Sequence, residues 1–305
     1  MDREQLLLER KNAIGASDIA PIMGLSPWRS ALDVYHEKVG EVNDYDNKTL
    51  QRGRRVEKYI LEEYAERSGE TLETNLPMLI DSYYPFLIGH ADAKVKDQNI
   101  IVEAKSTRSN ISSWKGQLPR HYLIQCAHYA AICDAERVDI PVLFNNWEYA
   151  CFTYYRDEEL EQRIRKAAIN FWHNHIIPRI PPAPQSTKDA LQEYPLSVSL
   201  KEIDADTNII KKVEELATVS NKINELKEKE EDLKTKIMEY MRDAERLNTP
   251  LGYFVLWKQC TQNRVDVSKL KAEHPEIYSE YLRAAQFRPL KIMRNNNDTE
   301  NAFNF

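Results

Sequence analysis

The sequence predicts a mixed α/β core followed by a mainly helical C-terminal region. Three observations support this: residues 86–105 have the pattern of a β-hairpin, residues 138–144 and 148–155 form two β-rich stretches after a helical one, and apolar residues beyond 207 recur every three, four or seven positions. Because short strands alternate with helices in the first part, we expect one central mixed sheet flanked by helices.

The composition is that of a soluble protein with one large domain or two. The chain has 305 residues, 42% of them hydrophobic and 30% charged, and no apolar run reaches the roughly 18 residues that a membrane span needs. The start, MDREQLLLERKN, lacks the apolar segment of a signal peptide, so we expect a cytoplasmic protein without membrane contact. The four cysteines have no C-x-x-C spacing, which argues against a zinc or iron–sulfur site. A net charge of −6 means that any nucleic-acid binding needs a local basic groove.

Residues 10–40 predict two short helices around an exposed turn. Ser17 or Asp18 can cap the first helix, which Gly24 ends, and Ser30 can cap the second, which ends at Gly40. The turn between them reads Ser-Pro-Trp-Arg and includes Trp28 and Arg29. Ser17 has a second interpretation, compatible with the first: its hydroxyl and the guanidinium of Arg10 can hold a phosphate at a helix N-terminus.

Residues 49–69 predict an amphipathic helix with Val56, Ile60, Leu61 and Tyr64 on its buried side. Glu57 lies beside that face, and Arg52, Arg54 and Arg55 are close to it in sequence. These arginines form either a basic approach for DNA phosphates or an ordinary solvated charge run. Residues 71–85 then supply an edge strand and a turn.

The hairpin of residues 86–105 contains the residues that we consider for catalysis. Phe86–Ile88 starts its first strand, the turn falls at residues 96–99, and Glu103 and Lys105 share one face of the second strand. The Asp92 side chain can point towards the Glu103 and Lys105 side chains. Two carboxylates suit a hard cation such as Mg²⁺, and a lysine can orient or deprotonate an attacking water. The spacing is the signature of PD-(D/E)xK nucleases, although an ordinary hairpin with polar outward residues has the same pattern.

The following stretches complete the core. Pro119 can open a helix in which Gln125 and Tyr129, four residues apart, share one stripe. Residues 138–144 and 148–155 are two strands, and residues 158–177 form an amphipathic helix.

The last third of the chain has a different pattern. We predict an exonuclease-type core over residues 1–180, a Pro-rich linker over 181–206, a helical region over 207–294 and a disordered tail over 295–305. Within the helical region, residues 207–247 predict one long amphipathic helix or a helical hairpin, 251–258 a strand, and 265–282 a helix that Pro275 interrupts.

The stretch IGASDIAPIMGLSPWRSALDVYHEKVG resembles the opening motif of the YqaJ-type viral recombinases, relatives of bacteriophage lambda exonuclease. The resemblance covers about residues 10–155 and places five features in the family's order: this motif, Glu57, Asp92, Glu103-x-Lys105 and Gln125. It implies a PD-(D/E)xK, restriction-endonuclease-like core. It also implies that Asp92, Glu103, Glu57 and the Ala104 carbonyl hold Mg²⁺, for which Mn²⁺ can substitute, and that Lys105 and Gln125 position the nucleophilic water.

The resemblance implies a Mg²⁺-dependent exonuclease that digests duplex DNA from 5′ ends and leaves 3′ single strands for a single-strand annealing recombinase. It also implies a homo-oligomer, as a ring trimer or a tetramer. The DNA and phosphate contacts would be Arg10, Ser17, Trp28, Arg29, Arg52, Arg54 and Arg108. One departure is His90, where lambda exonuclease has a serine two residues before the metal aspartate. Two alternatives stay open: a structure-specific or single-strand endonuclease on the same core, and a non-catalytic scaffold that recruits a recombinase.

Overall fold

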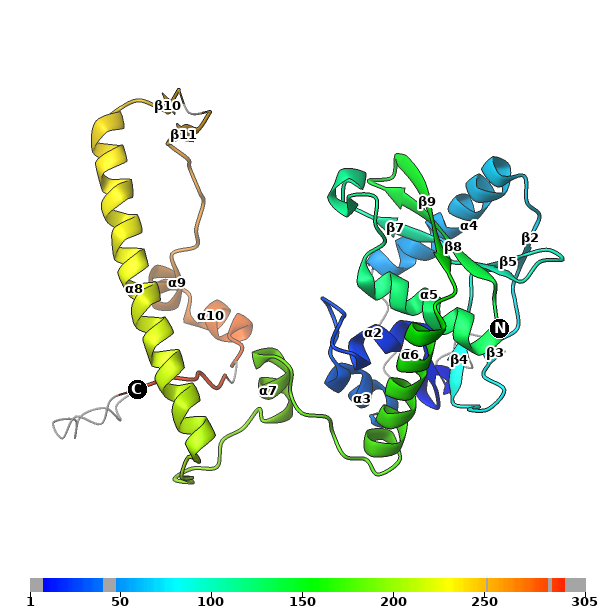
Figure 1. The fold of residues 1–305 in the computed structure, drawn as a ribbon. Coiled ribbons are helices and arrows are strands. Elements are labelled where there is room, and N and C mark those ends of the chain that lie inside the picture. Colours follow the sequence, from blue (N-terminus) through cyan, green and yellow to red (C-terminus); the bar gives the residue numbers. More distant parts are fainter. Residues whose placement is uncertain (1–7, 41–47, 251, 285–286, 294–305) are drawn as a thin grey trace. The chain divides into compact units, whose positions relative to one another are not determined.

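The computed structural model describes residues 8–40, 48–250, 252–284 and 287–293. The chain divides into two compact units, Met1–Glu193 (unit 1) and Tyr194–Phe305 (unit 2) (Figure 1). The elements of unit 1 are β1 (Ile14–Gly15), α2 (Ala16–Ile22), α3 (Ala31–Val39), α4 (Lys48–Ser68), β2 (Leu72–Thr74), β3 (Leu79–Ile80), β4 (Leu87–Gly89), β5 (Ala93–Val95), β6 (Ile100–Val102), β7 (Lys105–Thr107), η1 (Ile111–Trp114), α5 (Arg120–Cys133), β8 (Arg137–Phe144), β9 (Glu148–Tyr155), α6 (Glu158–Phe171), η2 (Trp172–Ile176) and α7 (Thr187–Glu193). Those of unit 2 are α8 (Thr207–Met241), β10 (Arg246–Asn248), β11 (Phe254–Leu256), α9 (Val267–Glu273) and α10 (Pro275–Tyr281).

The main sheet of unit 1 is mixed. Strand β2 pairs with β5, and β5 with β6, in the antiparallel sense, whereas β6 and β7 both run parallel to β8. The same register joins β6 and β7 to β8, because Ile100 faces Arg137 and Lys105 faces Val142, and 137 − 100 = 142 − 105 = 37. Together β6 and β7 are therefore one interrupted strand along one edge of β8, and β9 is antiparallel to β8 on the other edge.

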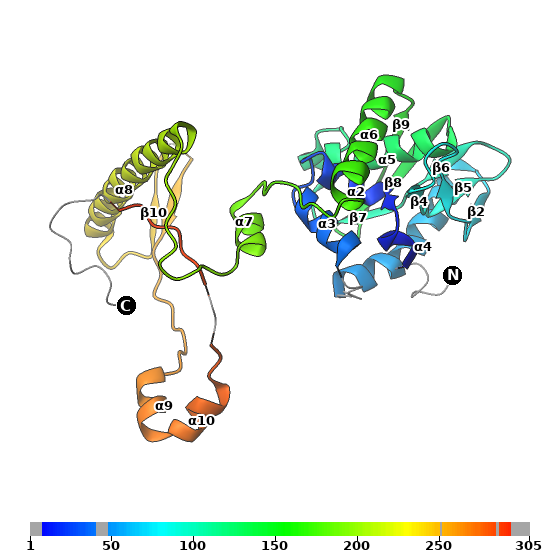
Figure 2. The ribbon, with the colours of Figure 1, turned by 90° about the horizontal axis from the view of Figure 1, so that it is seen from below.

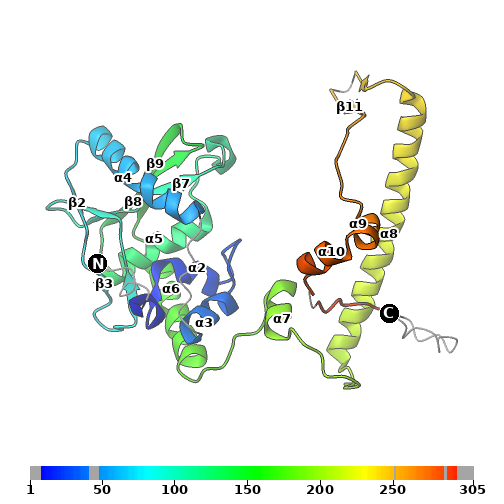
Figure 3. The same cartoon turned by 180° about the vertical axis from the view of Figure 1, so that it is seen from behind.

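Helices cover both faces of this sheet, as predicted. Side chains alternate along each strand, so Ile100 and Val102 pack against Leu61 and Tyr64 of α4. Ile101, between them, belongs to the larger hydrophobic cluster built with α2, α5 and α6. Figure 2 shows α4 on one side of the sheet and α5 and α6 on the other, and Figure 3 shows α4 from behind. The predicted mixed central sheet flanked by helices is confirmed.

The predicted hairpin differs from the structure in its first strand. The turn at residues 96–99 and the pairing of β5 with β6 are as expected, but Phe86–Ile88 does not start that strand. Instead β4 belongs to a second sheet, where it pairs with β1 in parallel and with β3 antiparallel. The chain bends between β4 and β5, so Asp92 lies at the junction of the two sheets. Neither β1 nor β3 is long enough to produce an alternating pattern in the sequence.

Gly89 gives a testable packing prediction, because β4 passes close to α5. A Cβ atom on Gly89 would lie 2.8 Å from the Tyr129 ring and 2.9 Å from Ile132 Cδ1. We expect Gly89→Ala to lower the free energy of unfolding by about 1–3 kcal/mol, since both neighbours are in the core. Gly53 is the matched control: nothing lies within 4 Å of its added Cβ on α4, so Gly53→Ala should stabilise by about 0.5–1 kcal/mol. Urea titration of both variants measures this, and equal changes in the two would contradict the packing argument.

The two helices of the opening motif are present, with one difference in capping. Ser30 caps α3 as predicted, since its hydroxyl accepts a hydrogen bond from the Asp33 N–H at 3.1 Å. The first helix begins two or three residues earlier than expected, with Gly15 as its N-cap instead of Ser17 or Asp18. Asp18 acts from the third helical position, where its carboxylate accepts the Gly15 N–H at 3.0 Å. The chain can enter α2 at Gly15 because β1 holds that residue beside β4.

The predicted linker at 181–206 contains a helix, and this corrects the assignment of the whole stretch as a linker. Helix α7 belongs to unit 1. Asp189 is buried and its carboxylate accepts the Gln185 N–H at 2.9 Å, while Glu193 lies 3.3 Å from His36 of α3. Proline-rich composition at 181–184 therefore marks the approach to a docked helix.

Unit 2 has the predicted long helix, α8, as a single helix without a break. Residues 246 and 247, which we expected to be helical, belong to β10, which pairs with β11 in an antiparallel hairpin. Pro275 separates α9 from α10 as expected. The predicted tail, 295–305, lies outside the described residues. Among the described residues, none of the helices is both long and apolar enough to span a membrane.

Candidate active site

The candidate site lies where β6 gives way to β7. The Glu103 N–H donates to the Asp139 carbonyl at 2.9 Å, so the parallel ladder with β8 continues into residue 103. The next bond in such a ladder would come from the N–H of residue 141, which is a proline and has none. Pro141 thus explains why pairing stops at Glu103 and Ala104 and resumes at Lys105.

The sheet register brings Asp92 to this break. Ala93 faces Val102 in the antiparallel pair of β5 and β6, so Asp92 and Glu103 come next along the two strands and point to the same face. The Asp92 carboxylate accepts the Ala104 N–H at 2.8 Å. This backbone bond fixes the side chain beside the interrupted strand, as the sequence predicted for a converging pair.

Glu103 is the centre of the site. One of its oxygens, Oε1, accepts hydrogen bonds from the Lys105 ammonium and from the Gln125 amide of α5, both at 2.6 Å. The other oxygen, Oε2, is buried and has no hydrogen-bond partner within the part of the chain that the structure describes. A buried carboxylate oxygen without a hydrogen-bond partner lowers stability unless a cation or a water molecule binds to it. The structure therefore brings together Asp92, Glu103, Lys105 and Gln125.

The two carboxyl groups affect each other electrostatically. Burial raises the pKa of Asp92, the Glu103 carboxylate raises it further, and against the opposing charge of Lys105 it reaches about 8. For Lys105, burial alone would lower the pKa, but the charges of Glu103 and Asp92 outweigh it and raise the pKa above its usual range. Burial and the Glu103 charge thus favour the protonated form of Asp92, beside the Glu103–Lys105 ion pair.

Glu57 is less closely joined to the site. Its charge contributes to the raised pKa of Asp92, so α4 does bring it towards the pair. No group of three or more acidic, histidine or cysteine side chains close enough to hold a metal ion occurs among the described residues. The structure thus supplies two carboxylates at the break, with Glu57 outside that immediate set. Its role as a metal ligand stays a prediction.

The opening motif forms a charged cluster that the sequence indicated only in part. A guanidinium nitrogen of Arg10 donates to the Ser17 hydroxyl at 3.1 Å, so these two predicted phosphate contacts are neighbours. Beneath them Asp18 is fully buried and forms ion pairs with Lys38 at 2.6 Å and with Arg29 at 3.3 Å. Burial would raise the pKa of Asp18, but the charges of Lys38, Arg29 and Arg10 outweigh it and hold the pKa well below its usual range.

Trp28 and the start of α5 form an aromatic path to the site that sequence reasoning missed. The Trp28 side chain is exposed and its ring meets His121 edge-on, with centroids 4.7 Å apart. His121 contacts Tyr122 at 4.2 Å, and the Lys105 ammonium lies 5.6 Å from the centre of the Tyr122 ring. Arg29, in contrast, is engaged by Asp18 and Glu37. The adjacent pair His121-Tyr122 ahead of Gln125 was the signal available in the sequence.

The remaining predicted DNA contacts are dispersed. Arg52 is on α4 and is half-buried, whereas Arg108 is exposed just after β7. Arg54 is on α4, but its side chain lies outside the described residues. The departure at His90 also has a structural account: its ring nitrogen lies 3.5 Å from Glu9, and its carbonyl accepts the Tyr129 hydroxyl at 2.8 Å. Burial lowers the pKa of His90.

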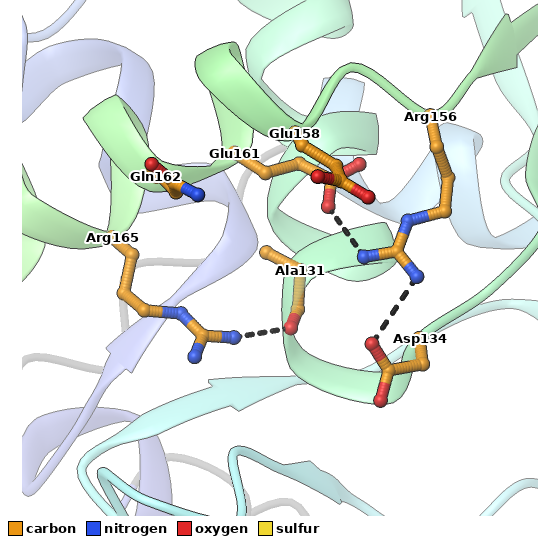
Figure 4. A pocket seen from close by; sticks show the side chains of 7 residues that line it. All are labelled: Ala131, Asp134, Arg156, Glu158, Glu161, Gln162 and Arg165. Atoms are coloured by element: carbon orange, nitrogen blue, oxygen red, sulfur yellow. Dashed lines mark hydrogen bonds and ion pairs between the residues drawn. The ribbon is translucent and has the colours of Figure 1, made fainter.

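A separate pocket lies at the other end of α5, beside α6 (Figure 4). Its two arginines are already engaged: Arg156 pairs with Asp134 and Glu161, and Arg165 donates to the Ala131 carbonyl and pairs with Asp81. These contacts hold α5 against α6, and we assign the pocket no ligand.

Glu-x-Lys at the interruption of a mixed sheet, an aspartate opposite it on the adjoining strand, and a glutamine from the covering helix together define a PD-(D/E)xK-type core. The model of the YqaJ-like viral recombinase domain matches residues 6–136. Residues 6–136 are therefore similar to the YqaJ-like viral recombinase domain, and the predicted resemblance is confirmed.

Several individual proteins are also similar to this chain. The chain is 26% identical over 302 residues, 96% of this chain and 94% of the relative, to a protein of Bacillus subtilis (strain 168) described as uncharacterized protein YqaJ. It is 18% identical to the alkaline exonuclease LHK-Exo of Laribacter hongkongensis, with a TM-score of 0.47, covering 56% of this chain and 91% of that one. It is 16% identical to a phage-related exonuclease of Haemophilus somnus 129PT, with a TM-score of 0.43, covering 55% of this chain and 96% of that one.

Proposed function

We propose that this protein is a metal-dependent DNA exonuclease. The observation that carries the proposal is the state of Glu103: one oxygen is held by Lys105 and Gln125, while the other is buried without a partner among the described residues and lies on the same face as Asp92. An ordinary hairpin does not bury a carboxylate oxygen in this way.

The donor set fits a hard divalent cation. Carboxylate and carbonyl oxygens are the ligands that Mg²⁺ prefers, and the orphaned Glu103 oxygen, Asp92 and the Ala104 carbonyl would hold it, with Glu57 contributing directly or through water. Mn²⁺ accepts the same ligands and should substitute. When bound, the cation polarises the scissile phosphate and lowers the pKa of a water molecule.

The protein side chains have separate tasks in this proposal. Lys105 is a charged ammonium, held by Glu103, so it is suited to orient the attacking water and to stabilise negative charge on the phosphate. Gln125 fixes the Glu103 carboxylate from α5 and can contact the same water. Arg10 and Ser17 would bind a terminal phosphate, and the exposed Trp28 ring would stack on a base at the duplex end.

The finer assignments rest on the domain family and on the resemblance of the opening motif. We propose duplex DNA as substrate, digestion in the 5′-to-3′ direction, and 3′ single strands as the product for a single-strand annealing recombinase. A terminal-phosphate site at Arg10 and Ser17 would suit an exonuclease that acts from 5′ ends.

The test uses linear duplex DNA labelled separately at its 5′ and 3′ ends, with Mg²⁺. We expect release of the 5′ label by the wild type and by Lys96→Ala, a lysine in the exposed turn of the same hairpin, and no release by Lys105→Ala. Equal activity of Lys105→Ala would refute the site. Release of the 3′ label alone would refute the polarity and leave the site intact.

A circular duplex distinguishes the alternatives. An exonuclease leaves it uncut, whereas an endonuclease on the same core linearises it. Wild-type protein that binds DNA ends but digests neither substrate with Mg²⁺ or Mn²⁺ would favour the scaffold role.

A further inference from the structure

Helix α8 has a seven-residue repeat of apolar side chains with two charged interruptions. Numbered as a heptad that starts at Ile209, eight of the ten core positions from 209 to 240 are apolar. Such a seam is what two helices need in order to pack as a coiled coil. The a positions are Ile209, Leu216, Ile223, Glu230 and Ile237, and the d positions are Lys212, Val219, Leu226, Leu233 and Tyr240.

Within unit 2 this seam is exposed. The exposed fractions of its apolar side chains range from 38% for Ile237 to 77% for Tyr240, although the helix has 35 residues. The short segment Leu290–Met293 lies beside Lys212, Val213 and Leu216 and covers only the first turns in part, since Leu216 stays 42% exposed. An apolar stripe of this length indicates a partner helix.

The charges on the seam disfavour a parallel pair with a second copy. In register, Glu230 would meet Glu230 of the other copy, and Lys212 would meet its own equivalent. Flanking positions g and e would bring Lys222 to Lys227 and Lys229 to Lys234. All these contacts join like charges, which destabilise a coiled coil.

An antiparallel pair removes nearly all of these conflicts. In such a pair position a of one helix packs against position d of the other, and one register places Lys212 opposite Glu230 twice. The same register pairs Ile209 with Leu233, Leu216 with Leu226, and Val219 with Ile223. A shift by one heptad would instead put Glu230 opposite Val219 or Lys212 opposite Ile223, so only this register satisfies both charges.

The flanking charges agree with that register. Positions g face each other in an antiparallel pair, which brings Glu215 to Lys229, and positions e bring Asp206 to Lys234. One like pair remains, Lys222 with its own equivalent, beside the two-fold axis. In the single chain Asp206 caps α8, and the other groups include local, exposed ion pairs such as Lys212 with Glu215 at 2.9 Å and Lys234 with Glu230 at 2.8 Å. Such pairs exchange easily for contacts with another chain.

We propose that α8 is a dimerisation element that pairs antiparallel with α8 of a second copy of this chain, about a two-fold axis near residue 221, the mean of 212 and 230. Leu290–Met293 moves aside where the helices meet. A two-fold contact fits the predicted tetramer, which two such pairs can build, and does not by itself build a ring trimer.

Charge reversal tests the register on the full-length protein. Sedimentation from about 1 µM to about 100 µM should give a dimer of 2 × 35.7 = 71.4 kDa or an even multiple of the chain. Lys212→Glu and Glu230→Lys should each raise the dissociation constant by about tenfold or more, and the double variant should restore it. Both residues are exposed, so the fold is not at risk. Glu228→Lys, at an outward position of the same helix, should change nothing.

Disulfide formation gives an independent readout of direction. In a background with the exposed Cys151 and Cys260 changed to serine, Ser220→Cys should cross-link two copies under oxidation, because its equivalent lies across the axis. Asn221→Cys, which points outward, should not. A monomer or trimer over the whole concentration range, a double charge variant that fails to restore association, or cross-linking of Ile223→Cys without Ser220→Cys would each overturn the proposal.

Discussion

Asp92→Asn is expected to abolish DNA digestion and at the same time to make the metal-free protein more stable. Asp92 is held against Glu103 and away from water, which raises its pKa to about 8. Above about pH 4 the unfolded chain loses this proton, whereas the folded protein keeps it until about pH 8. The contribution of Asp92 to stability therefore falls as the pH rises through this window. Asparagine cannot titrate, and its amide oxygen can still accept the Ala104 N–H.

The expected gain for Asp92→Asn at pH 7 is on the order of 2 kcal/mol in the free energy of unfolding, while the rate of digestion falls by about 10³-fold or more. Thermal unfolding with and without Mg²⁺ measures the stability and the binding of the metal, and the end-labelled duplex assay measures the rate of digestion. Mg²⁺ should raise the melting temperature of the wild type and leave that of the variant unchanged, since binding to the native state alone stabilises it.

Asp97→Asn is the control for this experiment. Asp97 lies in the exposed turn of the same hairpin, with a positive φ of 60° that asparagine adopts readily. It should change neither digestion nor the response to Mg²⁺. If Asp92→Asn digests DNA at the wild-type rate, or if Mg²⁺ stabilises both proteins equally, Asp92 is not part of a metal site.

The sequence predicted those parts of the fold whose patterns are local. Strand β9 has the predicted bounds, β8 starts one residue earlier than predicted, and α4 and α5 cover the predicted stretches, since alternation and helical periodicity both act over a few residues. The second sheet was missed because β1 and β3 have two residues each and gain their stability from pairing with β4. Likewise β10 reads as the end of a helix, and only its pairing with β11 makes it a strand.

The candidate site shows the same division. Glu103 and Lys105 are two residues apart, so the sequence itself put them on one face of a strand. The interruption between them depends on Pro141, which is distant in sequence, and no local pattern indicates it. The charged cluster below the opening motif was missed for a similar reason. Asp18 read as a helix cap, and no local pattern singled out Lys38; burial by the surrounding helices makes them an ion pair.

The Asp18–Lys38 pair gives the second large prediction. Both side chains are almost wholly buried, at 0% and 3% exposed, and the Lys38 ammonium also donates to the Arg10 carbonyl at 2.5 Å. Lys38→Met keeps the length of the side chain but leaves the Asp18 charge with only the more distant Arg29 as its ion-pair partner among the described residues. Removing one member of a buried ion pair costs about 3–5 kcal/mol, so we expect a loss of this size in the free energy of unfolding.

A double-mutant cycle separates the pair from the site as a whole. Asp18→Asn alone should also lower the free energy of unfolding. The double variant Asp18→Asn with Lys38→Met should lose about 1–3 kcal/mol less than the sum of the two single losses, because neither buried charge remains. Lys188→Met is the control, since Lys188 is exposed and lies 3.5 Å from Asp33; its loss should be below about 1 kcal/mol. Additive losses in the cycle would show that the two charges are not coupled. Because Lys38 also holds the backbone of Arg10, coupling would mean that the predicted phosphate contact is positioned by the buried pair beneath it.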